Sequence, residues 1–142
     1  MSKINKINVF EFLTPKASTY FLSDRNSVRQ AWEKFDYHKF SVVPILNDKG
    51  EYVSSVSEGD ILRFIKSNGT LHIDQLNNIS ILDIPHYRPY VSLKVDATFE
   101  EMFGLATSQN FIPVVDDRDK FIGIIKRKDL FLFLKRISDQ KN

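Results

Sequence analysis

The sequence predicts an α+β fold in which a β-α-β-β-α unit occurs twice, with the two copies packed about a pseudo-two-fold axis. The main observation is that residues 43–65 and 112–134 align without a gap at an offset of 69 residues, with apolar positions matching in class along both copies. Four residues are identical at equivalent positions: Pro44 and Pro113, Asp48 and Asp117, Asp60 and Asp129, Phe64 and Phe133. We expect the copies to pack together, because each alone is too small to close a core.

The elements of each copy follow from local patterns. The apolar runs VVPIL (42–46) and FIPVV (111–115) predict strands, and each is followed by an Asp-rich turn and a second β-rich strand, EYVSSV (51–56) or FIGII (121–125). Apolar residues at helical spacing predict four helices, which span 26–38, 58–67, 96–108 and 127–137. Thr98 and Glu101 have the spacing of a capping box, with Asp96 as a rival N-cap. STYFL (18–22) and RPYVSL (88–93) read as short opening strands.

The length of 142 residues predicts one compact domain. Within it we expect a first repeat over 10–68, a connector over 69–80 and a second repeat over 81–138. An Asn-Gly pair and polar composition mark the connector. IDQLNN (73–78) is predicted to form a short helix before the second copy, and KINVFEFL (6–13) a similar one before the first.

Composition excludes several kinds of function. The chain has no cysteine, which removes thiolate metal sites and cysteine nucleophiles, and His38, His72 and His86 lack metal-ligand spacing. No nucleophile elbow or glycine-rich phosphate loop is present, so we expect no enzyme activity, no metal and no resident cofactor. The net charge of +2 is too balanced to imply nucleic-acid binding. The longest apolar run, LFLFL (130–134), is too short to span a membrane, and no secretory segment is seen, so a cytoplasmic protein is expected.

Ser57 and Asp60 stand where the second strand of the first copy meets its last helix. Their spacing is near that of a capping box, which would make them a helix start and nothing more. Asp129 repeats the acid in the second copy without a Ser partner, because Lys126 occupies the equivalent position. A capping role requires the Ser hydroxyl at the first position, whereas binding of a diol requires only the Asp carboxylate. The sequence therefore leaves both a capping role and a binding role open.

The order of an apolar-Pro-apolar strand, a turn, and Ser-x-x-Asp before a helix resembles the CBS domain, and two in tandem resemble a CBS pair, or Bateman module. The resemblance implies a non-enzymatic regulatory module that binds an adenine nucleotide in clefts between the repeats and signals to a partner protein. It implies that Asp60 and Asp129 accept hydrogen bonds from ribose, that Ser57 contacts phosphate, and that backbone near Val43 and Ile112 faces the base. The full set of predicted nucleotide-binding residues is Val43, Pro44, Ser57, Asp60, Ile112, Pro113, Lys126, Arg127 and Asp129, of which Lys126 and Arg127 are included for their charge and not from the family pattern.

The chain departs from this pattern at two positions. Ser54 stands where the family favours Gly, and Lys126 stands in the Ser/Thr position of the second copy, where it begins a basic Lys-Arg-Lys run at 126–128. The added charge would suit a ligand with several phosphates, so a cyclic di-AMP receptor is one alternative. A ligand-free structural or interaction module is another. The basic run at 126–128 is most simply interpreted as a solvent-exposed helix face. Nucleic-acid binding is the more specific interpretation.

A homodimer is also expected. Phe131 and Phe133 lie about 200° apart around a helix, so one should face the core and the other a partner. We expect no membrane partner and no nucleic acid, and the regulated protein cannot be read from the sequence.

Overall fold

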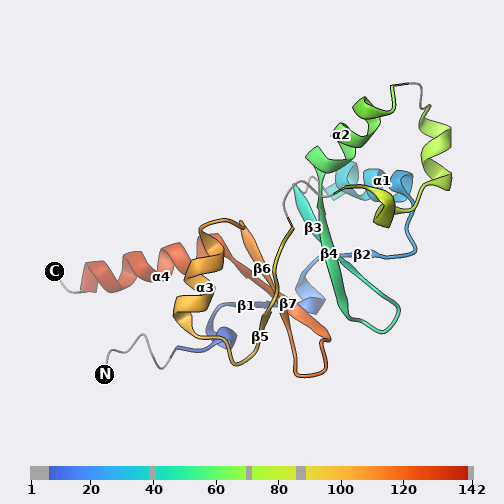
Figure 1. Cartoon of the computed structure of the whole chain (residues 1–142). Helices are drawn as coiled ribbons and strands as arrows, with labels where there is room; N and C mark the ends of the chain where they lie inside the picture. The colour runs from blue at the N-terminus through green and yellow to red at the C-terminus, as the bar shows by residue number, and fades with distance from the viewer. Residues whose placement is uncertain (1–6, 39–40, 70–71, 86–88, 141–142) are drawn as a thin grey trace. The chain divides into compact units, whose positions relative to one another are not determined.

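The computed structural model describes residues 7–38, 41–69, 72–85 and 89–140. The contacts divide the chain into two compact units (Figure 1). The first-repeat unit is Tyr20–Pro89, and the second-repeat unit combines Met1–Thr19 with Tyr90–Asn142. Helices together with two small sheets confirm the predicted α+β class.

The first-repeat unit is built on a three-stranded sheet in the order β2-β3-β4. Its elements are β2 (Leu22–Ser23), α1 (Val28–His38), β3 (Val42–Leu46), β4 (Tyr52–Ser57), α2 (Glu58–Ser67) and the 3₁₀ helices η4 (Ile73–Asn78) and η5 (Ile81–Asp83). β2 and β3 run parallel because α1 carries the chain back between them, whereas β3 and β4 form an antiparallel hairpin. α2 follows β4 directly, which places its first turn at the end of the sheet.

The second-repeat unit repeats this arrangement and adds a strand. Its elements are η2 (Val9–Glu11), β1 (Leu13–Pro15), η3 (Lys16–Ser18), β5 (Leu93–Lys94), α3 (Phe99–Ala106), β6 (Phe111–Val115), β7 (Phe121–Lys126) and α4 (Arg127–Gln140). The sheet has the order β1-β7-β6-β5, with β5 parallel to β6 and β7 antiparallel to both β6 and β1. The parallel pair is again joined through a helix, here α3.

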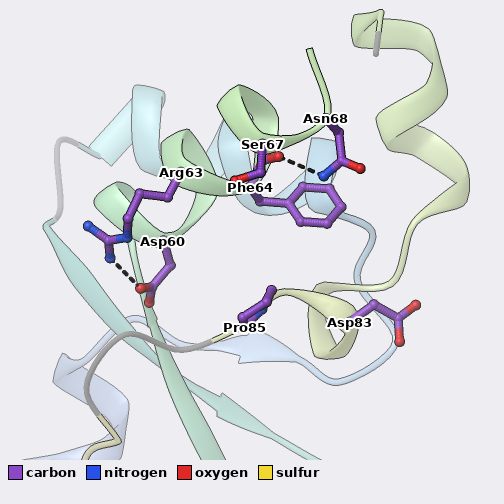
Figure 2. A pocket seen from close by; sticks show the side chains of 7 residues that line it. All are labelled: Asp60, Arg63, Phe64, Ser67, Asn68, Asp83 and Pro85. Atoms are coloured by element: carbon purple, nitrogen blue, oxygen red, sulfur yellow. Dashed lines mark hydrogen bonds and ion pairs between the residues drawn. The ribbon is translucent and has the colours of Figure 1, made fainter. Parts of the chain in front are cut away.

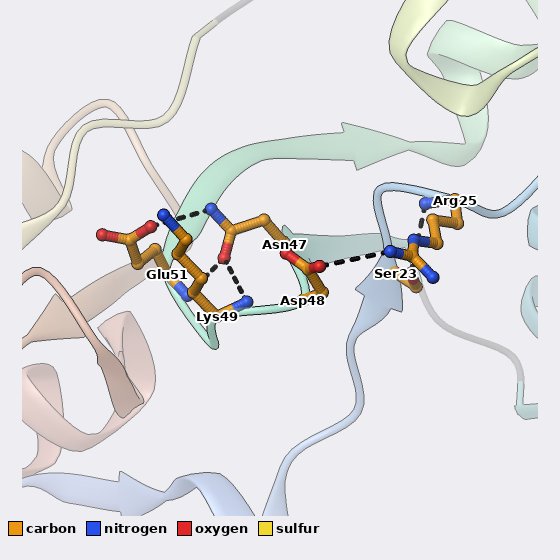
Figure 3. A network of polar contacts seen from close by, with 6 residues as sticks. All are labelled: Ser23, Arg25, Asn47, Asp48, Lys49 and Glu51. Carbon is orange, nitrogen blue, oxygen red and sulfur yellow. Dashed lines mark hydrogen bonds and ion pairs between the residues drawn. The ribbon is translucent and has the colours of Figure 1, made fainter.

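The turns between paired strands are closed by Asx-type hydrogen bonds, as the sequence predicts. Asn47 Oδ1 accepts hydrogen bonds from the backbone N–H groups of Lys49 at 3.0 Å and Glu51 at 2.9 Å (Figure 3). Asp116 repeats the pattern, accepting from the N–H groups two and four residues later at 2.8 and 2.9 Å. Arg25 and Asp48 form an exposed ion pair at 3.2 Å beside the first turn, which contributes about 1 kcal/mol or less.

Strand β1 joins the second-repeat unit although the predicted first repeat begins at residue 10. Leu13 pairs with Ile125 and Pro15 with Gly123. Gly123 has a φ of 152°, and a Cβ at this position would collide with the carbonyl oxygen of Thr14. Glycine is therefore required where β1 crosses β7. The repeat boundaries stay predictions, but the described residues before Tyr20, which are 7–19, belong to the second-repeat unit.

A short 3₁₀ helix that precedes each copy packs into the unit of the other copy. Val9 of η2 is fully buried in the core of the second-repeat unit, and Ile81 of η5 in that of the first. Both helices begin at a polar side chain, Asn8 or Ser80, that accepts a hydrogen bond from the backbone N–H two residues later. The short helices predicted at 73–78 and within 6–13 are present as η4 and η2, while residue 6 and residues 70–71 lie outside the described residues.

Each unit has its own hydrophobic core. The first is made of Leu22, Val28, Ala31, Phe35, Val43, Ile45, Val56, Ile61, Leu76, Ile81 and Ile84. The second is made of Val9, Phe12, Ala97, Phe99, Met102, Ala106, Ile112, Val114, Ile125 and Leu130. The second core also carries packed rings, since Phe12 lies 5.1 Å from Phe133 and 6.1 Å from Phe99 between ring centroids. Phe133 faces this core whereas Phe131 is 69% exposed, which confirms that they point to different surroundings.

All four helices overlap their predicted ranges, and α2 agrees at both ends. α1 begins two residues later than predicted, and α4 extends to Gln140, three residues beyond the predicted end. α3 begins at Phe99 because Thr98, not Asp96, is its N-cap, and it ends at Ala106, two residues before the predicted end. The apolar residues of α1 at helical spacing are buried in or packed against the first core, whereas Phe103 of α3 is 44% exposed. The opening strands form at Leu22–Ser23 and Leu93–Lys94, with Arg88 of the predicted second strand outside the described residues.

Candidate functional site

Ser57 and Asp60 form a complete capping box at the start of α2. The Asp60 N–H donates to Ser57 Oγ at 2.9 Å, and the Ser57 N–H donates to Asp60 Oδ2 at 2.9 Å. The box forms because β4 ends in extended backbone at Ser57, which leaves the first N–H groups of α2 without intrahelical partners. The capping interpretation of this pair is therefore confirmed, and any binding role is additional.

Asp60 has a second partner that a cap does not need. Arg63, one turn later on α2, donates from Nη2 to Asp60 Oδ1 at 2.7 Å. The Asp60 side chain is only 6% exposed, whereas that of Arg63 is 52% exposed. Because the guanidinium is half in solvent, the ion pair itself contributes about 1 kcal/mol or less. Its larger effect is to satisfy a carboxylate that burial would otherwise penalise.

Asp60 and Arg63 lie at a pocket of about 460 Å³ on the flank of α2 (Figure 2). The described residues that line it are Asp60, Arg63, Phe64, Ser67, Asn68, Asp83 and Pro85. Those from α2 follow the i, i+3, i+4, i+7 spacing of one helix face. Asp83 of η5 and Pro85 supply the opposite side, so all the described lining residues belong to the first-repeat unit.

The chemistry of the lining differs from end to end. Figure 2 shows Asp60 and Arg63 together on one side and Asp83 on the other, with Phe64 and Pro85 between them. One end thus presents an acceptor next to a cationic donor, the middle is apolar, and the far end is acidic. Such an arrangement can bind a flat group against the ring of Phe64 and polar groups at its ends.

The strand residues predicted to face a base have buried side chains. Val43 and Ile112 are 4% and 0% exposed and belong to the two hydrophobic cores. Pro44 pairs with Ser55 in the β3–β4 hairpin, and Pro113 pairs with Ile124 between β6 and β7. Their side chains are buried, so only their backbone could face a ligand, and that role stays a prediction.

At the junction of β7 and α4, Asp129 lacks the described partners that Asp60 has at the junction of β4 and α2. Lys126 ends β7 and Arg127 begins α4, and both are exposed. Arg127 Nε donates to the carbonyl oxygen of Ala106 at 2.7 Å, which ties the start of α4 to α3. Among the described residues, none forms a hydrogen bond or ion pair with the Asp129 side chain. Asp60 and Asp129 are therefore equivalent in sequence but not in surroundings.

A second pocket of about 290 Å³ lies between α3 and α4. Its described lining is Phe103, Ala106, Thr107, Arg127, Leu130 and Phe131. Arg127 is the only predicted site residue in this lining, and Asp129 does not take part. These described lining residues are mainly apolar and include no carboxylate, so they do not offer a diol acceptor.

Sequence reasoning missed Arg63, Phe64 and Asp83 as site residues. Arg63 had a usable signal, because Asp and Arg three residues apart on a helix commonly pair. Asp83 had none, since η5 lies more than 20 residues beyond Asp60 in the chain. Within the described part of the chain there is no group of three or more His, Cys, Asp or Glu residues placed to hold a metal ion. No described helix is long and apolar enough to cross a membrane.

Comparison with known proteins gives a match to a family model and to one related protein. A family model for the CBS domain matches residues 15–67 and 82–136. The Methanocaldococcus jannaschii protein MJ1426 is 27% identical over 124 residues, covering 68% of this chain and 74% of that protein.

Two solved structures are similar in fold. CbpB in complex with c-di-AMP gives a TM-score of 0.82 at 21% identity, covering 94% of this chain and 88% of the other. CBSX2 in complex with AMP gives a TM-score of 0.72 at 23% identity, covering 92% and 98%. At these identities the likeness shows the fold alone.

Proposed function

The chain belongs to the CBS domain family, and we propose that it is a non-enzymatic regulatory module that binds an adenine nucleotide of the AMP, ADP or ATP type and passes its occupancy to a partner protein. CBS-domain proteins are generally regulatory binding modules. A cytoplasmic location is part of the proposal.

One observation carries the proposal: the nearly buried Asp60 carboxylate lines a pocket large enough for a nucleoside. A carboxylate offers only acceptors, which matches the two donor hydroxyls of a ribose. Phe64 provides an aromatic face for a base, and Ser67 and Asn68 add polar groups. Similar proteins support the ligand class, since CBSX2 is described in complex with AMP and CbpB in complex with c-di-AMP.

A cyclic di-AMP receptor is the second candidate. The exposed basic run from Lys126 to Lys128 is the feature that favours it, because two phosphates require more positive charge than one. Asp129 lies one residue beyond this run and has no described partner of its own to displace. In that case Lys126→Ala should weaken binding and flatten its dependence on salt.

A homodimer is part of the proposal. Phe103 and Phe131 are 44% and 69% exposed and line the same apolar pocket between α3 and α4. Exposed aromatic side chains that cluster on a helical face are typical of an interface with a second chain.

A thermal-shift screen tests the ligand. AMP, ADP, ATP, S-adenosylmethionine and cyclic di-AMP are each added to the wild type, to Asp60→Asn and to Asp129→Asn. A ligand at 100 times its dissociation constant stabilises the folded protein by about 2.7 kcal/mol. We expect at least one adenine nucleotide to raise the melting temperature of the wild type, with a smaller shift in Asp60→Asn. If none of the five shifts the wild type, the module works without these ligands and an interaction role replaces the proposal.

A further inference from the structure

We propose that Arg63 is the phosphate-binding residue of the first-repeat pocket, so that this pocket selects a nucleoside phosphate over the bare nucleoside. The inference rests on the proposed function and deepens it, because it names the group that recognises the ligand's charge. Asp60 holds the ribose hydroxyls, and Arg63, now paired with Asp60, turns its donors to the phosphate.

Contacts with Asp60 and with the first turn of α2 restrain the position of the Arg63 guanidinium. Nη2 is held 2.7 Å from Asp60 Oδ1. A Cβ on Gly59 would lie 3.2 Å from Nη1 and 3.6 Å from Nη2, so the guanidinium lies against the first turn of α2 at a residue without a side chain. A donor held in this way loses less conformational entropy when an anion binds than a flexible surface cation does.

The electrostatics of this position favour an incoming anion. Cations are stabilised near the C-terminus of a helix and not near its N-terminus, where the backbone dipole is positive. Arg63 reaches back toward the N-terminal turn of α2, where Asp60 is its counter-ion. A phosphate placed there would interact favourably with both the guanidinium and the helix dipole.

The other groups of the pocket fix the direction in which the ligand lies. Asp83 stands away from the Asp60–Arg63 end (Figure 2), and its negative charge would repel a phosphate. The phosphate must therefore bind at Arg63, which leaves the base over Phe64 and Pro85. Arg63 is also the only Lys or Arg among the described residues of the lining.

The second repeat does not offer the same recognition. At the offset of 69 residues, Leu132 takes the position of Arg63, and it is 40% exposed. Among the described residues that line the apolar pocket between α3 and α4, none is a carboxylate that could hold a ribose beside Arg127. We therefore expect one phosphate-selective site of this kind in each chain, in the first repeat.

Titration calorimetry of AMP, adenosine and inorganic phosphate on three variants tests the inference. Arg63→Gln removes the charge, and Lys66→Gln removes an equal charge from an exposed site on the same helix outside the pocket. Gly59→Ala keeps the arginine but crowds its guanidinium, and alanine is the better helix former, so loss of folding is not expected. We expect Arg63→Gln to weaken AMP binding at least tenfold and Gly59→Ala several-fold, with adenosine binding unchanged and Lys66→Gln like the wild type.

The results distinguish a failure of the Arg63 role from a failure of the proposed nucleotide-binding function. Equal weakening of AMP and adenosine by Arg63→Gln, or no weakening of either, overturns the role of Arg63 while leaving a nucleotide site in place. If inorganic phosphate binds as tightly as AMP and is lost in Arg63→Gln, Arg63 is supported as an anion site and the nucleotide function fails. If neither AMP nor adenosine nor phosphate binds the wild type, the role of Arg63 falls, whereas the proposed function falls only if ADP, ATP, S-adenosylmethionine and cyclic di-AMP also fail to shift its melting temperature.

Discussion

Gly123 in β7 lies so close to Thr14 in β1 that a Cβ on Gly123 would overlap the carbonyl oxygen of Thr14. The same Cβ would lie 3.0 Å from Leu13 Cδ1 and 3.1 Å from Pro15 Cα. The backbone of Gly123 also has a positive φ of 152°, which other residues rarely adopt. This single glycine therefore permits the N-terminal strand to pair with a strand more than 100 residues away.

Replacement of Gly123 with Ala should disrupt the pairing of β1 with β7. We expect the free energy of unfolding to fall by about 3 kcal/mol, since strained backbone and a clash with main-chain atoms act together. Denaturation in urea measures it. Gly104→Ala is the matched control, because a Cβ at this exposed position in α3 meets nothing within 4 Å and should stabilise the helix by up to about 1 kcal/mol. Equal effects of the two substitutions would show that β1 is not held against Gly123.

The two equivalent aspartates should respond differently to the same change. Asp60→Asn removes the acceptor charge from two described hydrogen bonds at a nearly buried site, and we expect a loss of about 1–3 kcal/mol in unfolding free energy. Asp129→Asn removes no described side-chain hydrogen bond or ion pair and should change stability by about 0.5 kcal/mol or less. Chemical denaturation without ligand measures both. A loss of similar size in the two variants would contradict the inequivalence of the two junctions.

Acid stability should depend on the cap of α3. Hydrogen bonds from the Thr98 backbone N–H and hydroxyl hold the pKa of Glu101 below its ordinary value of 4.5. A lowered pKa in the folded state means that the ionised form stabilises the fold. This contribution is complete above the ordinary value and is lost as pH falls through the lowered pKa.

The variant Glu101→Gln tests this pH dependence. We expect its urea midpoint to fall less steeply than that of the wild type as pH is lowered from 5 toward 3. Glu100→Gln, one residue earlier and also exposed, serves as the control for a simple change in net charge. Parallel pH curves for the wild type and Glu101→Gln would exclude the effect.

The proposed homodimer should depend on Phe131. Phe131→Ser removes an exposed ring and should change the stability of a monomer by about 0.5 kcal/mol or less, yet it should weaken self-association. Light scattering at micromolar concentration measures the mass against the 16.5 kDa of one chain. Tyr37→Ser on α1, where the ring is 82% exposed, is the control. A wild type that scatters only as a 16.5 kDa monomer ends the proposal.

Local sequence determined the elements of this protein. α2 begins and ends where predicted, because Ser57 supplies a cap and the apolar spacing continues without interruption to Ile65. The hairpin turns follow from Asn47 and Asp116, whose side chains bond to backbone only a few residues away. Both the helix start and the turn are short-range hydrogen-bonded structures, so the residues that form them can be read in order along the chain.

Tertiary structure alone decided which segments complete each unit and which aspartate has partners. β1 pairs with β7, and Asp83 reaches the pocket of Asp60, through contacts between residues far apart in sequence. The duplicated motif predicts two equivalent acids, but Arg63 pairs with one of them, whereas Leu132 stands at the same position in the second copy. A repeat pattern records which residues are alike. The surroundings of each acid depend on neighbours that are not alike, and those neighbours meet only when the chain folds.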